Sequence, residues 1–541
     1  MDAVTTVPAP RNEAVLAYTP GSPERSALAE RVKEMASTQA ELRMNIGGET
    51  RLGRGAPIDV VQPHRHRHLL GRARGATPDD MSAAITATRT AGHDWRELSF
   101  DDRAAVFLRA AELLAGPWRS TLVAATMLGQ SKSVHQAEID ICELIDFWRF
   151  NVAFARQIHG EQPASGPREW NRVDYRPLEG FIYAVTPFNF TAIAGNLPTA
   201  PALMGNTVVW KPASTQILAA YFTMQLLEQA GLPPGVVNLV TGSGAAVSDA
   251  ALRHPDLAGI HFTGSTGVFQ HLWSTVAENL AAYRTYPRLV GETGGKNFVL
   301  AHPSADVETL ATLLVRGAFE YQGQKCSAAS RAYVPRSVWN RLREPLFAAV
   351  NELSYGDVGG NLGVFGGAVI DSRSHATLQS AIERAAVHPT ISTPVGGRCA
   401  QEDGWFVQPT IFVGEDPLDE IFTAEYFGPL LAIHVYDDGQ YPKMLKLVEE
   451  TSRYGLTGSI VARDPQVIAH AGQVLRFAAG NLYINDKPTG AVVGRQPFGG
   501  GRASGTNDKA GGPYNLMRWT SPRCIKENFA PPADYRYPYM D

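Results

Sequence analysis

The sequence predicts an α/β protein built around a doubly wound parallel sheet. The first observation is that short apolar runs alternate with helical segments after residue 180, as expected for parallel strands buried on both faces. These runs occupy residues 181–185, 206–211, 236–240 and 259–262. The second observation is length, because 541 residues exceed what one hydrophobic core usually serves. We therefore expect two or three domains or subdomains.

Composition and charge favour a small-molecule ligand. The chain is 44% hydrophobic and 19% charged, and its formal net charge is -4. This balance gives no electrostatic reason to expect nucleic acid or an anionic membrane surface as a partner. The most apolar stretch, residues 181–210, is interrupted by Pro187, Pro198 and Pro201. We expect buried strand, loop and helix there rather than a membrane span.

The cysteines and the N-terminus predict a cytoplasmic protein. Four cysteines stand far apart and form neither a CxxC pair nor the framework of a secreted disulfide-rich protein. They are Cys142, Cys326, Cys399 and Cys524. Residues 1–10 include Asp2 and lack the basic-then-apolar succession of a secretory signal peptide. A reducing compartment is the simpler interpretation.

The region before residue 160 is predicted to be mainly helical. We expect helices over residues 26–44, from Thr77 through 115, and over 135–157. Thr77 is a suitable N-cap because Pro78 follows it and two aspartates occupy the first turn. The alternating His–Arg run at 64–68 invites a metal or phosphate interpretation. Because it lacks Cys or carboxylate partners, we favour a solvated strand or loop and expect no metal site.

Two short stretches predict a contact between subunits. Residues 170–175 are polar and alternating, and they are bounded by Gly166–Pro167 and by Pro177. This pattern predicts a two-stranded excursion from the body of the protein. Residues 518–529, near the C-terminus, predict an added strand. We therefore expect a homodimer or a higher homo-oligomer.

Each predicted strand after residue 180 is followed by a polar or glycine-rich turn. The turns are residues 186–190, 211–214, 241–244 and 263–267. In a doubly wound sheet, ligands lie outside the carboxyl ends of the strands. A turn such as Gly264–Ser265 before a helix suits a pyrophosphate, although a simple structural turn explains it equally well. The GxGxxG dinucleotide fingerprint is absent.

A second α/β region follows Pro287 and contains the candidate nucleophile. Cys326 stands within GQKCS, and Glu292 stands upstream within GETGGK. The cation of Lys325 could lower the pKa of the neighbouring thiol, and the upstream carboxylate could be its base. A free cysteine alone is more often a small buried hydrophobe. The catalytic interpretation therefore depends on the rest of the chain.

The second region contains two further stretches of interest. Glu425 and Phe427 precede a Gly–Pro turn. They are either a strand entry with a packed aromatic, or a carboxylate for sugar hydroxyls with an aromatic near a flat ring. Residues 481–485 predict a strand. The glycine-dense loop at 490–501 is typical of disordered or ligand-wrapping segments.

Seven motifs occur in order along the chain. They are PFNF at 187–190, WKPAS at 210–214, FTGS at 262–265, GETGGKN at 291–297, GQKCS at 323–327, EYFGP at 425–429 and PFGG at 497–500. Together they make the chain resemble the aldehyde dehydrogenase superfamily across nearly its full length. Residues 319–328 and 497–513 look most like its Δ1-pyrroline-5-carboxylate dehydrogenase branch, also called L-glutamate γ-semialdehyde dehydrogenase.

The resemblance implies a catalytic role for three residues. Cys326 would attack the aldehyde carbon, and its backbone N–H and the Asn189 side-chain amide would hold the oxyanion. Losing one such donor typically costs about 100- to 1,000-fold in rate. Hydride would pass to NAD and leave a thioester. Glu292 would then act as the general base for its hydrolysis.

The resemblance also implies an NAD site. The expected cofactor-binding residues are Thr186, Lys211, Ser214, Gly264, Ser265, Glu425 and Phe427. Ser214 stands where many NAD-preferring relatives carry a glutamate that accepts from the ribose and repels a 2′-phosphate, so some use of NADP is compatible with the sequence. Phe269 stands where the superfamily pattern has a glycine, which leaves the phosphate contacts open.

For the substrate, the branch implies a carboxylate site and an apolar wall. Ser327 and the backbone N–H groups of Gly490 and Ala491 would bind the carboxylate. Phe190 and Phe498 would flank the aliphatic part of the molecule. Glu143 is a further candidate for the substrate amino group, but we favour a solvated helix face for it.

The resemblance implies an aldehyde dehydrogenase-like fold in which the chain is divided into four parts. The NAD-binding domain is expected at 1–158 and 177–288, a small β oligomerisation flap at 159–176 and 512–541, the catalytic domain at 289–480, and a return strand with an active-site loop at 481–511.

The implied activity is NAD-dependent oxidation of L-glutamate γ-semialdehyde to L-glutamate in proline catabolism, with a proline dehydrogenase as the implied partner. A dehydrogenase for another semialdehyde is the first alternative. A reductase that releases its thioester to coenzyme A is disfavoured, because Glu292 supplies a base for water. A catalytically silent relative is disfavoured by the joint presence of Cys326, Glu292 and Asn189.

Overall fold

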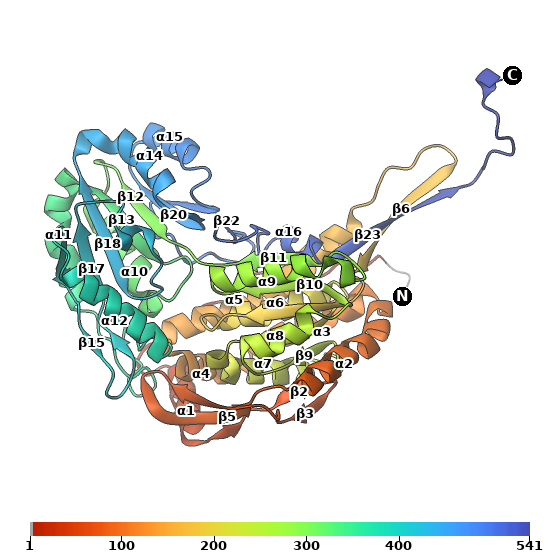
Figure 1. Cartoon of the computed structure of the whole chain (residues 1–541), viewed down its shortest axis with the longest axis horizontal. Helices are drawn as coiled ribbons and strands as arrows, with labels where there is room; N and C mark the ends of the chain where they lie inside the picture. The colour runs from red at the N-terminus through yellow and green to blue at the C-terminus, as the bar shows by residue number, and fades with distance from the viewer. Residues whose placement is uncertain (1–3, 541) are drawn as a thin grey trace.

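The computed structural model describes residues 4–540, and two seven-stranded sheets form its framework (Figure 1). The first sheet has the order β11-β10-β7-β8-β9-β2-β3. Its strands are β2 (Met44–Ile46), β3 (Glu49–Arg51), β7 (Phe181–Thr186), β8 (Thr207–Pro212), β9 (Val237–Leu239), β10 (Leu257–Thr263) and β11 (Arg288–Glu292). The five strands β7 to β11 are parallel. The predicted strands and the doubly wound parallel sheet are therefore confirmed.

Alternation along β7 explains why this sheet is covered on both faces. Phe181 and Tyr183 pack in one hydrophobic cluster, whereas Ile182 and Ala184 pack in another. The helices that accompany this sheet are α2 (Pro78–Glu97), α3 (Phe100–Ala115), α4 (Arg119–Gln130), α5 (Val134–Gly160), α6 (Thr191–Leu203), α7 (Ile217–Gln229), α8 (Gly244–Leu252) and α9 (Thr266–Glu278). Because β8 and β10 flank β7 on opposite sides, the carboxyl ends of β7 and β10 form a topological switch point.

The second sheet has the order β14-β17-β18-β13-β12-β20-β21. Its strands are β12 (Asn297–Ala301), β13 (Ala329–Pro335), β14 (Ile391–Val395), β17 (Thr410–Gly414), β18 (Leu430–Tyr436), β20 (Thr457–Val461) and β21 (Asn481–Ile484). All of its pairings are parallel except that of β14 with β17. The main helices of this part are α10 (Val307–Phe319), α11 (Arg336–Asn351), α12 (Ser372–Ala386), α14 (Tyr441–Thr451) and α15 (Pro465–Val474).

A two-stranded arm projects from the body of the molecule (Figure 1). Strand β6 (Glu169–Pro177) pairs antiparallel with β23 (Thr520–Asn528) along its full length. The predicted excursion and the predicted C-terminal strand are thus partners of one another, whereas their role in a subunit contact remains a prediction. In the described part of the chain, no helix is long and apolar enough to cross a membrane.

The structure corrects the helix expected near the N-terminus. The helix expected over residues 26–44 is α1 (Pro23–Ser37), and the chain then turns into strands because Met44–Ile46 pairs with β9 in the sheet. The remaining short elements are β1 (Ala40–Glu41), β4 (Pro57–Gln62), β5 (Arg65–Arg74), β15 (Cys399–Ala400), β16 (Phe406–Val407), β19 (Tyr454–Gly455), β22 (Gly501–Arg502), α13 (Glu420–Thr423) and α16 (Pro513–Met517).

The solvated interpretation of the His–Arg run is wrong for His64. This residue is buried, with its Nδ1 3.1 Å from Ser131 Oγ and its Nε2 3.3 Å from an Asp357 oxygen. It therefore connects the loop before β5 to α4 and to the second region. Sequence alternation could not predict this burial, because both partners are distant along the chain.

Candidate active site

Two cavities meet at Cys326. One cavity of about 390 Å³ opens at the carboxyl ends of β7, β8 and β10, and another of about 380 Å³ lies between α5 and residues 487–498. Cys326 is the residue that the two linings share. A larger cavity of about 1170 Å³ lies at the base of the arm, and none of the predicted site residues lines it. The chemistry-bearing residues therefore gather around the two smaller cavities.

A tight turn presents Cys326 to both cavities. Tyr321, Gln322 and Gly323 have φ angles of 49°, 53° and 64°, so three successive residues are left-handed. A Cβ at Gly323 would lie 2.2 Å from the carbonyl oxygen of Gly428, which explains the glycine. Gln322 holds the turn by donating from Nε2 to the carbonyls of Ser131 and Ala368 at 3.0 and 2.7 Å. Such strained backbone persists only where its surroundings fix it.

The expectation that Lys325 lowers the thiol pKa is wrong for this structure. Burial raises the pKa of Cys326 above its usual range, and the carboxylates of Glu292, Glu425 and Glu143 add to the effect. Lys325 does not compensate, because its ammonium lies 3.1 Å from the Glu320 carboxylate. The thiol is therefore mostly protonated at neutral pH and needs a base before it can attack a carbonyl.

This environment predicts a steep pH dependence for alkylation of Cys326. Below the thiol pKa the thiolate fraction rises about tenfold for each pH unit, so the rate with iodoacetamide should increase without a plateau from pH 6 to 9. Mass spectrometry of the Cys326 peptide would measure this rate separately from the other cysteines. A plateau below pH 8 would contradict the raised pKa.

Asn189 lies beside the thiol at the entry to α6. Its Nδ2 donates to the carbonyl of Gln324 at 3.0 Å, and its side chain lines the first cavity together with Cys326. The start of α6 is fixed by α5, because the N–H groups of Thr191 and Ala192 donate to Asp140 at 2.9 and 2.8 Å. One N–H of the Asn189 amide is used in the turn, and the second is left for a ligand.

Asp140 belongs to a buried ion pair that the sequence did not reveal. Lys132 Nζ lies 2.8 Å from Asp140 Oδ2, and it also lies 4.0 Å from the ring centre of Phe190 and 4.4 Å from that of Tyr321. The ammonium therefore joins the turn before Cys326 to the loop that carries Asn189 and Phe190. No motif around Lys132 signals this role.

Glu292 lies at the end of β11 but lines neither cavity in this conformation. Its Oε2 is shielded from solvent and has no hydrogen-bond partner in the described part of the chain. A Cβ at Gly499 would lie 2.9 Å from Oε1, so the carboxyl rests against the glycine-rich loop. Burial raises its pKa well above the ordinary value, and the nearby Lys509 ammonium opposes that rise.

Six of the seven expected cofactor residues line the first cavity, and Ser214 does not. The six are Thr186, Lys211, Gly264, Ser265, Glu425 and Phe427. Ser265 caps α9, so the N-terminus of that helix opens on the cavity. Glu425 Oε1 accepts from the Gly295 N–H at 2.7 Å, and burial raises the pKa of its carboxyl to about 7. Burial lowers the pKa of the Lys211 ammonium.

Phe269 lies inside the protein rather than against the first cavity. Its ring stacks on Phe262 at a centroid distance of 5.4 Å and an angle of 16°. A Cβ at Gly291 would lie 2.2 Å from Phe269 Cζ, so the ring occupies the space that this glycine leaves. The departure from the superfamily pattern is therefore accommodated by packing.

The second cavity contains all five expected substrate residues: Ser327, Gly490, Ala491, Phe190 and Phe498. Ser327 Oγ lies 2.7 Å from Thr489 Oγ1. Gly490 has a φ of 96°, which favours glycine at this position, and both Gly490 and Ala491 line the cavity. The cavity thus combines apolar walls with a cluster of hydroxyl and backbone donors.

Glu143 corrects one expectation about this cavity. It lines the cavity rather than a solvated helix face, and burial raises the pKa of its carboxyl to about 8. Other lining residues that the sequence did not single out include Asn12, His135, Lys487 and Thr489. Thr489 directly precedes Gly490 and was the one with a local signal.

The comparisons with known proteins agree with this architecture. The sequence model of the aldehyde dehydrogenase family matches residues 52–525, so the chain belongs to the aldehyde dehydrogenase family. It is 48% identical to a mitochondrial Δ1-pyrroline-5-carboxylate dehydrogenase of Bos taurus, over 98% of this chain and 94% of the relative. The expected resemblance to that branch is confirmed.

Solved structures give the same result. The Δ-pyrroline-5-carboxylate dehydrogenase of Mycobacterium tuberculosis bound with NAD is 60% identical, with a TM-score of 0.97 over 100% of both chains. Proline utilization A of Bdellovibrio bacteriovorus is 30% identical with a TM-score of 0.89, and the match covers 97% of this chain and 54% of that one. The aldehyde dehydrogenase-like fold is thus confirmed.

Proposed function

We propose that this chain oxidises L-glutamate γ-semialdehyde, the open form of Δ1-pyrroline-5-carboxylate, to L-glutamate with NAD, as a step of proline catabolism. The observation that carries the proposal is the position of Cys326, where a cavity at the sheet switch point meets a cavity with apolar walls and a polar end. The names of the Bos taurus and Mycobacterium tuberculosis relatives support this substrate.

The donors of the first cavity fit a nicotinamide dinucleotide. The start of α9 at Ser265 offers N–H groups to a pyrophosphate, and the Glu425 carboxylate offers acceptors to ribose hydroxyls. Lys211 would bind the adenosine ribose, and Phe427 would lie against the nicotinamide. NAD when bound accepts a hydride. The match to a relative solved with NAD supports this cofactor.

The residues around the thiol perform the rest of the reaction. A base removes the thiol proton, and Cys326 Sγ forms a bond to the aldehyde carbon. The second N–H of the Asn189 amide and the Cys326 backbone N–H hold the oxyanion. After hydride leaves, the thioester is attacked by water whose proton passes to Glu292. The C–S bond then breaks, the proton held by Glu292 passes to the leaving thiolate, and the carboxylic acid is released.

Glu292 must turn toward Cys326 to accept the proton of the attacking water, because its carboxyl now rests against Gly499. The raised pKa of Glu292 suits a group that both takes and returns a proton during the reaction. Oε2 has no hydrogen-bond partner in the described part of the chain, so the turn would have to break only the backbone hydrogen bond that the carboxyl accepts from Gly500.

The second cavity selects a substrate with a charged end. Ser327, together with the N–H groups of Gly490 and Ala491, would bind the α-carboxylate. Phe190 and Phe498 would pack against the methylene carbons, and Glu143 would face the amino group. Burial raises the pKa of the Glu143 carboxyl, and a nearby ammonium would stabilise its ionised form.

Turnover with different aldehydes tests this proposal. We expect kcat/KM for glutamate γ-semialdehyde to exceed that for propanal by roughly tenfold or more, about 1.4 kcal/mol, when NADH formation is followed. A parallel series with NADP would measure the effect of Ser214. Equal or better use of propanal would contradict the substrate and leave the family unchanged.

We also propose that the arm joins copies of this chain and that a proline dehydrogenase supplies the substrate. The exposed Trp170 on β6 supports the first proposal. The match to about half of proline utilization A supports the second. Light scattering of the purified protein would give the oligomeric state.

The four unpaired cysteines support a cytoplasmic location, although the Bos taurus relative is named as mitochondrial.

A further inference from the structure

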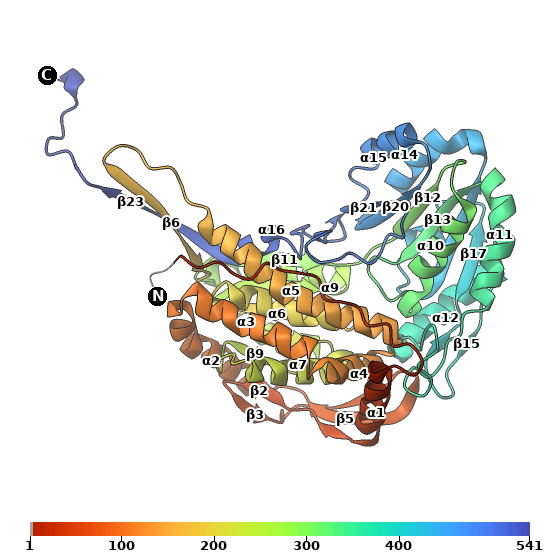
Figure 2. The same ribbon diagram turned by 180° about the vertical axis from the view of Figure 1, so that it is seen from behind.

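The N-terminal segment reaches the second cavity although it is far from the motifs in sequence. Residues 12–18, which we call the strap, lie along α5 (Figure 2). Asn12, Glu13 and Val15 of the strap line the same cavity as Ser327 and Gly490. The strap also precedes residues 52–525, the part that matches the aldehyde dehydrogenase family model. It therefore contributes to the cavity wall from outside the residues that the family model matches.

Asn12 joins two sides of this cavity through one amide group. Its Nδ2 donates to Asp146 Oδ2 on α5 at 2.8 Å and to the carbonyl of Val493 at 2.9 Å. Its Oδ1 accepts from Arg495 Nε at 3.0 Å. Both N–H groups and the carbonyl of the amide are thus used. Val493 and Arg495 belong to residues 489–495, which we call the carboxylate loop because it contains Gly490 and Ala491.

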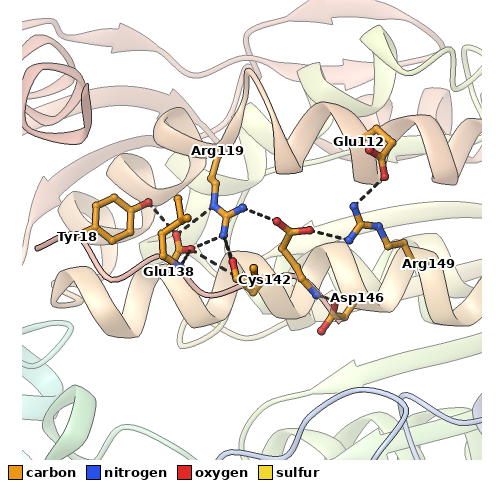
Figure 3. A network of polar contacts seen from close by, with 10 residues as sticks. Tyr18, Glu112, Arg119, Glu138, Cys142, Asp146 and Arg149 are labelled. Atoms are coloured by element: carbon orange, nitrogen blue, oxygen red, sulfur yellow. Dashed lines mark hydrogen bonds and ion pairs between the residues drawn. The ribbon is translucent and has the colours of Figure 1, made fainter. Parts of the chain in front are cut away.

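The rest of the strap is held firmly enough to fix Asn12. The Glu13 N–H donates to Asp146 Oδ1 at 2.7 Å, and the Glu13 carboxylate accepts from Arg119 and Arg149 at 2.6 and 2.7 Å. Tyr18 donates to Glu138 at 2.8 Å, and Arg119 is hydrogen-bonded to the same glutamate (Figure 3). Charge-assisted hydrogen bonds of this kind fix geometry as well as add energy.

The carboxylate loop has few other side-chain contacts of this kind. Its start is held by the hydroxyl pair of Thr489 and Ser327 at 2.7 Å. Gln496 Oε1 accepts from the Val492 N–H at 3.0 Å, but Gln496 itself is exposed. Asn12 therefore provides the side-chain hydrogen bonds that tie the far end of the loop to α5, beside the apolar packing of Val493 and the contact of Gly494 with Phe150. A displaced loop would move the N–H groups of Gly490 and Ala491 away from the substrate carboxylate.

We infer that Asn12 is a positioning residue: its amide holds the carboxylate loop against α5, and the strap thereby sets the preference for aldehydes that carry a carboxylate. This inference rests on the proposed function, because it needs a substrate whose charged end binds at Gly490 and Ala491. It extends that function to a segment that precedes the residues matched by the family model. The effect should appear in KM, because Asn12 acts on the loop that binds the carboxylate and takes no part in the chemical step at Cys326.

Asn12→Ala is the direct test. We expect KM for glutamate γ-semialdehyde to rise about tenfold with kcat within about twofold, because the two hydrogen bonds of Asn12 to the loop and the one to α5 are lost. In the same preparation, kcat/KM for propanal should fall no more than about twofold, which also reports that the variant is folded. Inhibition by L-glutamate should weaken in parallel with the rise in KM.

Two further variants sharpen the result. Asn12→Asp keeps an acceptor for Arg495 but loses both N–H donations and places a charge beside Asp146, so its KM should rise more. Thr5→Ala is the matched control, because Thr5 is hydrogen-bonded to Asp101 and Arg156 at 2.5 and 2.8 Å and does not line the cavity. Its KM should stay at the wild-type value.

The outcomes separate the two proposals. A wild-type preference for glutamate γ-semialdehyde with no change of KM in Asn12→Ala would overturn the inference and leave the function intact. Equal losses with both aldehydes would overturn it as well, since that is the behaviour of a general structural residue. A wild-type enzyme that prefers propanal would overturn the proposed function and the inference together.

Discussion

Replacing Cys326 with alanine should abolish aldehyde oxidation and leave NAD binding in place. The thiol is the nucleophile that both cavities share, and no other cysteine lies at their junction. Loss of a catalytic nucleophile can lower kcat on the order of 10⁵-fold or more. Removing one sulfur atom leaves the donors expected for the dinucleotide unchanged. NADH formation measures the first effect, and calorimetric titration with NAD measures the second.

Cys399→Ala is the matched control for this experiment. Cys399 is also an unpaired, half-buried cysteine of the second region, but it lines neither cavity. We expect its turnover to match that of the wild type. Retention of more than about a hundredth of wild-type activity in Cys326→Ala would remove the thiol mechanism, because such a residue would not be an essential nucleophile.

Replacing Glu292 with glutamine should stop the enzyme at the thioester. Glutamine keeps the volume of the side chain but cannot take a proton from water, so hydrolysis should slow by roughly 100- to 10,000-fold. Hydride transfer would still occur once on each active site. Stopped-flow absorbance should then show one equivalent of NADH formed rapidly, followed by slow steady-state turnover.

Glu143→Gln is the control that distinguishes a catalytic base from a carboxyl that only lies near the thiol. Glu143 also has a pKa raised by burial, to about 8, but it lines the second cavity where the substrate amino group would lie. Its replacement should raise KM and give no NADH burst. Unchanged steady-state turnover in Glu292→Gln, with a burst in Glu143→Gln, would transfer the role of base to Glu143.

The sequence was sufficient to predict four of the seven strands of the first sheet, β7 to β10. Runs such as residues 181–185 and 259–262 are apolar on both faces because helices cover both sides of the sheet, and their polar turns lie at its carboxyl edge. Thr186 and Gly264 come together at the switch point for the same reason. These features depend on local pattern and on general rules of topology, so they could be read from the chain.

Features that depend on which groups the fold brings together could not be predicted in this way. His64 is buried because Ser131 and Asp357 approach it from other elements. Lys325 is paired with Glu320, five residues earlier, rather than being free to lower the thiol pKa. Local spacing shows which charges exist, but the fold decides which of them are partners.

The strap illustrates the same limit on a larger scale. Asn12 and Val493 are hydrogen-bonded across almost the whole length of the chain. Residues 4–22 have neither the apolar periodicity nor the motif that would assign them to a cavity. Their position beside the candidate substrate site is visible only in the structure, where the strap lies along α5.

The central claim is that Cys326 carries the substrate as a thioester. The most direct test is to mix Glu292→Gln with NAD and glutamate γ-semialdehyde, quench in acid, and measure the mass of the Cys326 peptide. The account predicts that this peptide gains one glutamyl group in step with the NADH burst. An unmodified Cys326 peptide after NADH has formed would contradict it.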